Sequence, residues 1–160
     1  MVKMILCIDL NGYIGKDNDL LFKMKEDMAF FREQTMNNIV IMGYNTWLSL
    51  GRKPLPNRAN IVMTDEKIKN IQTSTDLVSV IKDYEKYPQD IFIIGGAYVY
   101  NQALELNLVD EILVTLVRTR VKDAIVRVNI ELFERFEDRK IIKTFINNEG
   151  DKVEIWRMRK

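Results

Sequence analysis

Short apolar runs alternate with amphipathic stretches along most of the chain, and this alternation constrains the fold more than any other feature. Buried strands are expected at residues 2–10, 38–43, 59–64, 90–96 and 111–117. Helices are expected at residues 25–35, 44–50, 76–86 and 97–106. Strands that alternate with helices form a mostly parallel sheet with helices on both faces.

The end of the chain follows a different pattern, with apolar residues at every second position. "KIIKTFI" at 140–146 and "KVEIWRMR" at 152–159 flank the turn "NNEGD", which predicts an antiparallel hairpin at one edge of the sheet. Residues 11–21 are expected to form a loop, and residues 118–130 show no clear period. The sequence therefore predicts a single α/β domain over residues 1–160 with a central sheet of about eight strands.

Local signals refine one helix of this plan. Ser74 or Thr75 is placed to cap the helix over 76–86, because hydroxyl side chains accept hydrogen bonds from the first free backbone N–H groups. The inward stripe of that helix is expected to consist of Leu77, Val80, Ile81 and Tyr84.

Charge and cysteine content limit the partners that the protein can have. The 24 basic and 23 acidic residues leave a net charge of +1, so electrostatics give no reason to expect a nucleic acid or an anionic membrane as partner. The apolar runs are far shorter than the ~20 residues that span a bilayer. The single cysteine, Cys7, excludes an internal disulfide and fits a reducing compartment. We therefore expect a cytoplasmic protein.

Histidine is absent, which limits the chemistry of any active site. Ser–His and Cys–His nucleophiles and His-ligated metals are excluded, and no metal site is expected. Acid–base chemistry must come from Asp, Glu, Lys, Tyr, Cys or water. Asp27 in "KEDMAFF" lies beside Phe30 and Phe31 on the predicted helix, where a buried charge is costly. This stretch alone favours a solvated acid that groups with Lys25 and Glu26 over a catalytic carboxylate.

Two segments share the order strand, glycine, helix start: "IVIMGYNT" at 39–46 and "IFIIGGAYV" at 91–99. Backbone N–H groups at a helix start bind phosphate, and glycine lets the phosphate approach, so the pair could hold a dinucleotide. A tight turn is an equal alternative, since neither segment fits G-x-G-x-x-G. Arg52 and Arg58 frame a proline-stiffened loop, and each could clamp a carboxylate or simply be solvated.

Taken together, these segments resemble one family, dihydrofolate reductase. The matching stretches are "IG" at 14–15, "NDLLFKMKEDMAFFRE" at 18–33, "VIMGYNTWLSLG" at 40–51, "LPNRANIV" at 55–62 and "IIGGAYVY" at 93–100. The resemblance covers nearly the whole chain, and residues 118–130 match poorly. It implies that the protein is a monomer that reduces 7,8-dihydrofolate to tetrahydrofolate with hydride from NADPH.

The resemblance also implies site residues. Asp27 would hydrogen-bond the 2-amino group and N3 of the pterin and support protonation of its N5, and Thr115 would complete this network through its hydroxyl and a water. Arg58 would clamp the glutamate carboxylate of the substrate, with Arg52 as a helper. The implied substrate contacts are Ile5, Cys7, Met28, Phe31, Leu50, Arg52, Leu55, Arg58, Ile94 and Tyr100.

The implied cofactor contacts follow the two glycine-led helix starts. They are Cys7, Ile14, Gly15, Asn18, Gly43, Tyr44, Asn45, Thr46, Ser49, Thr64, Gly95, Gly96, Ala97 and Tyr98. Cys7 and Ile14 would meet the nicotinamide with backbone groups, and residues 9–24 would close over it.

Four positions depart from the family pattern. Tyr44 stands where the family usually has arginine, Tyr98 where it often has a basic residue, and Asp65 where a small hydroxyl residue often meets the 2′-phosphate. Of the loop that supports the closing segment, only Asp123 in "DAIVRV" remains. The first three predict a preference for NADPH over NADH of roughly tens-fold, because arginine–phosphate contacts are missing.

Two alternatives to this function remain from the sequence. One is a catalytically weak binding or structural protein with the dihydrofolate reductase fold, which the missing arginines and the eroded loop favour. The other is a reductase of a riboflavin-pathway intermediate, which has a related fold. Asp27, Phe31 and Arg58 argue against the second, because its substrate has no glutamate tail to clamp.

Overall fold

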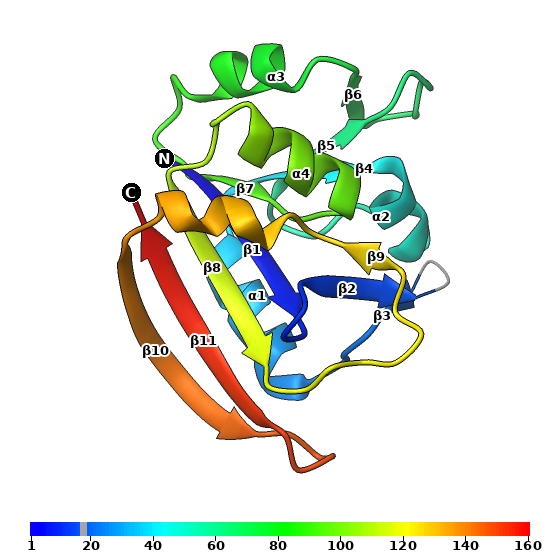
Figure 1. The fold of residues 1–160 in the computed structure, drawn as a ribbon. Coiled ribbons are helices and arrows are strands. Elements are labelled where there is room, and N and C mark those ends of the chain that lie inside the picture. Colours follow the sequence, from blue (N-terminus) through cyan, green and yellow to red (C-terminus); the bar gives the residue numbers. More distant parts are fainter. Residues whose placement is uncertain (17–18) are drawn as a thin grey trace.

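The computed structural model describes residues 1–16 and 19–160 and contains one large sheet. Its strands are β1 (Val2–Ile8), β4 (Ile39–Gly43), β5 (Ala59–Met63), β6 (Gln72–Ser74), β7 (Ile91–Ile93), β8 (Glu111–Val117), β10 (Asp138–Ile146) and β11 (Lys152–Arg159). They lie in the order β10-β11-β8-β1-β7-β4-β5-β6, as Figure 1 shows. From β8 to β6 all pairs are parallel, and β11 runs antiparallel to both β8 and β10. The predicted sheet and C-terminal hairpin are confirmed.

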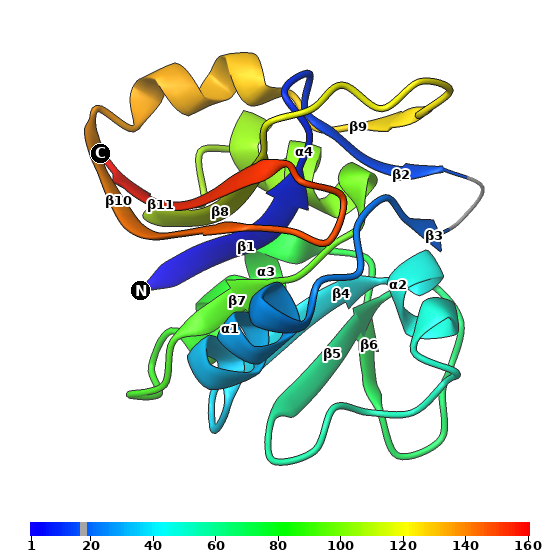
Figure 2. The ribbon, with the colours of Figure 1, turned by 90° about the horizontal axis from the view of Figure 1, so that it is seen from below.

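Helices cover both faces of this sheet (Figures 1 and 2). They are α1 (Lys25–Thr35), α2 (Tyr44–Ser49), α3 (Leu77–Tyr84), α4 (Ala97–Glu105) and the 3₁₀ helix η1 (Ile130–Arg135). The helices α1 and α2 pack on one face, and α3, α4 and η1 pack on the other. None of the helices among the described residues has the length and apolarity that a membrane crossing requires.

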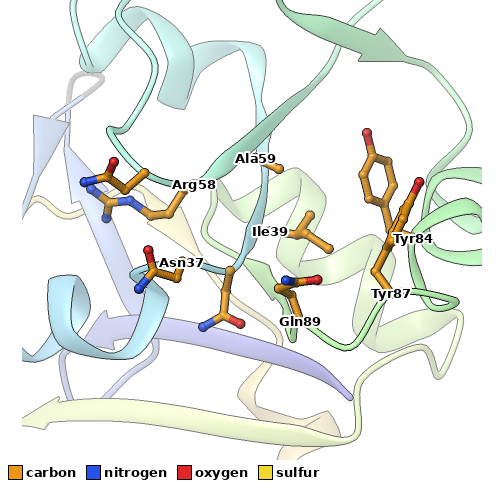
Figure 3. A pocket seen from close by; sticks show the side chains of 9 residues that line it. Asn37, Ile39, Arg58, Ala59, Tyr84, Tyr87 and Gln89 are labelled. Atoms are coloured by element: carbon orange, nitrogen blue, oxygen red, sulfur yellow. The ribbon is translucent and has the colours of Figure 1, made fainter.

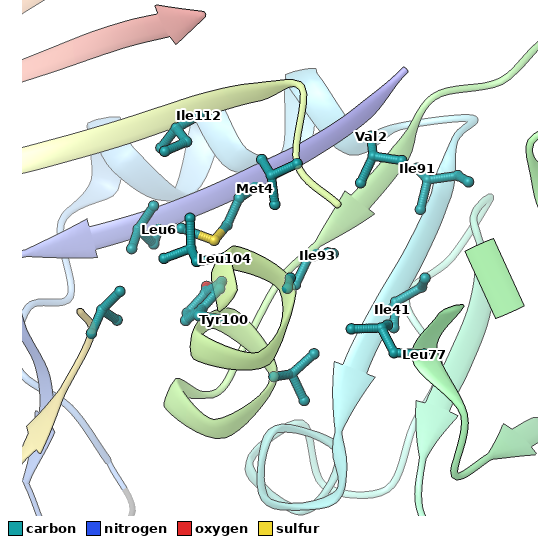
Figure 4. Close-up of a cluster of buried hydrophobic side chains, with 14 of the residues drawn as sticks. Val2, Met4, Leu6, Ile41, Leu77, Ile91, Ile93, Tyr100, Leu104 and Ile112 are labelled. Carbon is teal, nitrogen blue, oxygen red and sulfur yellow. The ribbon is translucent and has the colours of Figure 1, made fainter. Parts of the chain in front are cut away.

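Alternate residues of the central strands supply two separate cores. Ile39 and Ile41 of β4 join the cluster under α3 and α4, whereas Val40 and Met42 join the cluster under α1 and α2. All four are buried, as expected for a strand covered on both faces. Figure 4 shows the larger cluster, in which Tyr100 of α4 lies among aliphatic side chains of the central strands.

A second sheet was not expected from the sequence. It has the order β3-β2-β9, with β2 at Tyr13–Lys16, β3 at Asp19–Leu20 and β9 at Val126–Arg127. Tyr13 and Gly15, which lie in the segment predicted as a loop, thus pair with Arg127 and Val126 of the segment 118–130. The strand predicted at 2–10 ends at Ile8, because the next residue, Asp9, is fully buried and turns the chain.

The carboxylate of Asp9 joins these two segments. Its Oδ1 accepts hydrogen bonds from the backbone N–H groups of Asn11 and Tyr13, both at 2.9 Å. Its Oδ2 accepts from the backbone N–H of Val121 at 3.0 Å. Three charge-assisted hydrogen bonds compensate the burial of this carboxylate, so Asp9 fixes the turn after β1 to the loop after β8.

The cap of α3 differs from the prediction. Asp76 caps the helix, and its Oδ1 accepts from the backbone N–H of Ser79 at 3.1 Å. Ser74 instead accepts from the backbone N–H of Asp76 at 3.1 Å and so positions the cap. The predicted inward stripe is confirmed at Leu77, Val80 and Ile81, which are buried, while Tyr84 is partly buried against the same core.

Candidate active site

Asp27 lies in the first turn of α1 and faces the ends of two neighbouring strands. The hydroxyl of Thr115 on β8 donates a hydrogen bond to its Oδ1 at 2.5 Å. Cys7 on β1 is the direct register partner of Thr115, so both side chains leave the sheet on the same face, beneath α1. The thiol of Cys7 lies close enough to Asp27 to affect the pKa of its carboxyl group. The hydroxyl of Thr115 thus contacts Asp27 directly.

Burial dominates the electrostatics of this group. It raises the pKa of Asp27 above the usual 3.8, while the hydrogen bonds from Thr115 and Cys7 oppose the rise. Burial also raises the pKa of the Cys7 thiol well above its usual value, and the charge of Asp27 adds to this. Tyr100 is buried, with its pKa raised by burial, and its hydroxyl donates to the backbone carbonyl of Ile5 at 2.7 Å. Neutral donors thus surround the carboxylate.

An apolar wall extends from Asp27 towards α2. Its side chains belong to the cluster between the sheet and the helices α1 and α2: Ile5, Phe31, Leu50, Leu55 and Ile94. These five predicted substrate contacts lie on one side of the sheet. Met28 differs, because 64% of it is exposed and it does not join this cluster. Met28, an implied substrate contact, therefore lies outside the apolar wall.

Arg58 is fixed against the C-terminal end of α1. Its Nη1 donates to the hydroxyl oxygen of Thr35 at 2.9 Å, and its Nε donates to the carbonyl of Pro56 at 2.9 Å. Partial burial and the nearby charge of Arg32 lower the pKa of its guanidinium. Arg52 lies apart from this arrangement, since it is exposed beyond the end of α2 and its charge acts on Tyr44.

A cavity of about 510 Å³ borders Arg58 (Figure 3). It lies at the start of β4 and β5, where Ile39 and Ala59 line it, and Tyr84 and Tyr87 close its far side. The cavity thus lies where β4 and β5 begin, whereas Cys7 and Thr115 lie near the carboxyl ends of their strands. The cavity is therefore separate from the group around Asp27.

A second cavity, of about 490 Å³, opens where α2 and α4 begin. Gly43 and Gly96 are the N-caps of these helices, and the backbone N–H of Gly43 donates to the carbonyl of Gly95 at 2.7 Å. A Cβ on Gly43 would lie 3.1 Å from Val99, and one on Gly95, whose φ is +125°, would lie 3.2 Å from the hydroxyl of Thr46. Only glycine fits Gly95 without strain, so backbone stays accessible at both helix starts.

Half of the predicted cofactor residues line this cavity directly. They are Gly43, Tyr44, Asn45, Thr64, Gly96, Ala97 and Tyr98. Gly95 and Thr46 lie just behind it, and the hydroxyl of Ser49 donates within α2 to the carbonyl of Thr46 at 2.7 Å. Ile14 and Gly15 lie on β2, and Asn18 falls outside the described residues.

Five further residues line the cavity and were not predicted: Met63, Thr75, Val99, Gln102 and Val126. Two of them could have been predicted from the sequence, because Met63 ends strand β5 and Thr75 directly follows strand β6. The carboxyl ends of parallel strands meet at one edge of a sheet, where ligands bind. Val126 could not have been predicted, because it reaches the cavity through the unexpected pairing of β9 with β2.

The fold and the site together define an α/β protein with a cavity at two glycine-led helix starts and a half-buried carboxylate over neighbouring strands of the same sheet. A sequence model of the family described as dihydrofolate reductase matches residues 1–153, and the chain belongs to this family.

Individual relatives agree with this assignment. The chain is 43% identical over 103 residues to a dihydrofolate reductase of Bacillus subtilis, a match that covers 62% of this chain and 60% of that protein. It is 32% identical over 151 residues to a bifunctional dihydrofolate reductase–thymidylate synthase of Paramecium tetraurelia, covering 91% of this chain and 32% of that protein. The matched regions thus span less than two thirds of these relatives.

One solved structure has the same fold as the whole chain. It is a dihydrofolate reductase from Enterococcus faecalis in complex with NADP(H) and RAB-propyl, with a TM-score of 0.79. The two sequences are 21% identical, and the superposition covers 100% of this chain and 96% of the other.

Proposed function

We propose that the protein reduces 7,8-dihydrofolate to 5,6,7,8-tetrahydrofolate with NADPH. The observation that carries this proposal is the half-buried carboxylate of Asp27, which accepts a hydrogen bond from Thr115 and lies beside Cys7 and an apolar wall. Family membership supports dihydrofolate over an intermediate of the riboflavin pathway as the substrate.

Asp27 carries the proton chemistry in this proposal. The reaction adds a hydride to C6 and a proton to N5 of the pterin, and NADPH supplies the hydride. In water N5 is too weakly basic to take the proton. A desolvated carboxylate that accepts hydrogen bonds from the pterin amino group and N3 raises that basicity and fixes the orientation of the ring. Thr115 holds the carboxylate in place through its hydroxyl.

The apolar wall and Arg58 would bind the rest of the substrate. Ile5, Phe31, Leu50, Leu55 and Ile94 offer a surface for the flat rings, since they share one cluster. Arg58 would clamp the glutamate carboxylate, and its bonds to Thr35 and Pro56 already orient the guanidinium. Arg52 remains a candidate helper, and Met28 would cover the open side of the site.

The cavity at the starts of α2 and α4 would hold the dinucleotide. Backbone N–H groups at two helix starts suit its two phosphates. Ile14 on β2 and Cys7 on β1 would border the nicotinamide, which places this end of the cofactor beside Asp27. Asp9 would support the covering sheet by joining residues 9–13 to Val121. We further propose a monomer in the cytoplasm.

The test is steady-state oxidation of NADPH with dihydrofolate by the purified protein and by Asp27→Asn. We expect the variant to lose at least ~10²-fold in turnover at neutral pH, the usual size of an acid–base contribution, with an unchanged circular dichroism spectrum. Asp83→Asn, an exposed carboxylate on α3, is the control and should turn over like the parent. Turnover of Asp27→Asn within a few-fold of the parent would exclude this role. A parent that binds both ligands without turnover would be a binding protein.

A further inference from the structure

The side chain of Thr35 ends α1 and is fully buried. Its hydroxyl donates to the backbone carbonyl of Phe31, one helical turn earlier, at 2.8 Å. Because a hydroxyl has a single proton, its oxygen can only accept from other groups, and it accepts from Nη1 of Arg58 at 2.9 Å. Thr35 therefore joins the guanidinium of Arg58 to the helix that carries Phe31, a residue of the apolar wall.

The side chain of Asn60 on β5 holds the backbone end of Arg58. Its Nδ2 donates to the backbone carbonyls of Leu55 and Arg58, at 3.0 and 2.9 Å. Its Oδ1 accepts from the backbone N–H of Leu55 at 2.9 Å. One carboxamide thus satisfies three backbone groups that lie outside any helix or strand, and it fixes the loop that carries both Leu55 of the apolar wall and Arg58.

The held guanidinium of Arg58 keeps one edge available. Its Nε donates to the carbonyl of Pro56 at 2.9 Å, and its Nη1 uses one N–H for Thr35. The remaining N–H groups, on Nη1 and Nη2, have no hydrogen-bond partner among residues 1–16 and 19–160. Because Nε is occupied, a carboxylate can form two parallel hydrogen bonds only with the Nη1–Nη2 edge.

This inference rests on the proposed function, in which Arg58 binds the glutamate carboxylate of dihydrofolate. A long side chain that is mobile before binding loses rotamer freedom when it binds, and this loss lowers the affinity. In Arg58 this freedom is already lost on folding, because Thr35 holds the guanidinium and Asn60 holds the backbone. We infer that Thr35 and Asn60 are positioning residues, which preset the Nη1–Nη2 edge of Arg58 for the substrate carboxylate.

Equilibrium binding of 7,8-dihydrofolate and of 7,8-dihydropteroate, which lacks the glutamate, tests this inference without turnover. Thr35→Val keeps the shape of the side chain and removes the hydroxyl. We expect it to lower the ratio of dihydrofolate to dihydropteroate affinity by about 3- to 10-fold, the effect of ordering one long side chain on binding. Asn60→Ala should lower the ratio in the same sense. Thr35→Ser keeps the hydroxyl, and Thr144→Val lies on the exposed strand β10, so both should keep the ratio of the parent.

A double-variant cycle separates positioning from a purely structural role. In the Arg58→Leu background, Thr35→Val should leave the ratio unchanged, because Thr35 acts through Arg58. An unchanged or raised ratio in Thr35→Val alone, or an equal drop in both backgrounds, would overturn the inference for Thr35. An unchanged ratio in Asn60→Ala would overturn it for Asn60.

The outcomes also separate this inference from the proposed reaction. A protein that binds dihydrofolate without reducing it, and shows the expected drop in Thr35→Val, would refute the reaction and keep the inference. A parent that binds both ligands equally but reduces dihydrofolate would keep the reaction and overturn the inference, because Arg58 would then not bind the glutamate.

Discussion

At the scale of single residues, the hydrogen bond from Thr115 to Asp27 limits how far burial raises the pKa of the carboxyl group. Burial raises the pKa of Asp27, and Thr115 is the strongest opposing contact, followed by Cys7. Tyr100 is the other titratable group that interacts with the carboxylate from a facing element, and its raised pKa keeps it neutral. Loss of the Thr115 hydroxyl must therefore raise the pKa of Asp27 further.

This sign gives a pH prediction for Thr115→Val. Reduction consumes a proton, so the rate of the chemical step falls as pH rises, and in the proposed mechanism the midpoint is the apparent pKa of the coupled pair of Asp27 and N5. We expect the midpoint to move to higher pH in Thr115→Val, measured as single-turnover hydride transfer across pH. Thr144→Val, on the exposed strand β10, serves as the control. A midpoint that stays or moves to lower pH would contradict the role of Asp27 in raising the basicity of N5.

Residue chemistry explains which parts of the site the sequence could reveal. Because histidine is absent, acid–base chemistry had to fall to residues such as Asp27. Its position beside Phe30 and Phe31 follows from the sequence, since residues three and four apart share a helix face. Val126 could not be found this way. It reaches the cavity through the pairing of β9 with β2, and no local period relates these two segments.

At the scale of elements, Asp9 joins the turn after β1 to the loop after β8 and so supports the small sheet. In Asp9→Asn only the amide oxygen can accept hydrogen bonds, because the amide NH₂ group is a donor. Either the backbone N–H of Val121 or those of Asn11 and Tyr13 therefore lose their acceptor. We expect a loss of about 1–3 kcal/mol in unfolding free energy, the cost of an unsatisfied buried group, and weaker binding of NADPH. Denaturant unfolding and cofactor titration measure the two effects.

The comparison for this prediction is Asp138→Asn, at the exposed start of β10. It should change neither quantity. If Asp9→Asn binds NADPH as tightly as the parent despite its lower stability, the small sheet does not contribute to the cofactor site.

The elements themselves were predicted where apolar period and length agreed. The runs that became β4, β7 and β8 are nearly all apolar, so their burial on both faces was visible in the sequence. The strand β6 is the polar triplet Gln72–Ser74, and β9 has two residues, so neither carries a pattern of its own. Both strands form because a neighbouring strand, β5 or β2, offers free backbone groups for pairing. The local sequence does not show that these neighbours are adjacent in the fold.

At the scale of the whole molecule, the sheet order arranges the site as a line. Asp27 and Thr115 lie over β1 and β8, the two helix starts follow β7 and β4, and Thr64, which lines the cavity, follows β5. The proposed substrate and cofactor sites are therefore neighbours along one sheet edge.

The same sheet has two edge strands, β6 and β10, and their length, exposure and charge predict the oligomeric state. The strand β6 is only three residues long, whereas β10 has nine and is exposed along nearly its whole length. Exposed backbone groups and apolar side chains such as Ile141, Ile142 and Ile146 invite pairing with another chain. A register shift between Ile141 and Lys143 interrupts the edge, and lysines within the strand add charge. Both features oppose continuous pairing.

We therefore expect light scattering to report the monomer mass of 18.8 kDa at about 100 µM, a concentration at which an unprotected edge would associate. The double variant Lys140→Val with Lys143→Val removes the charges and extends the apolar run on β10, so it should associate or precipitate at the same concentration. Lys82→Val on α3 changes charge and hydrophobicity equally per site but lies on a helix, so it should remain monomeric. A parent protein with twice the monomer mass would show that β10 is an interface and that its lysines do not prevent pairing.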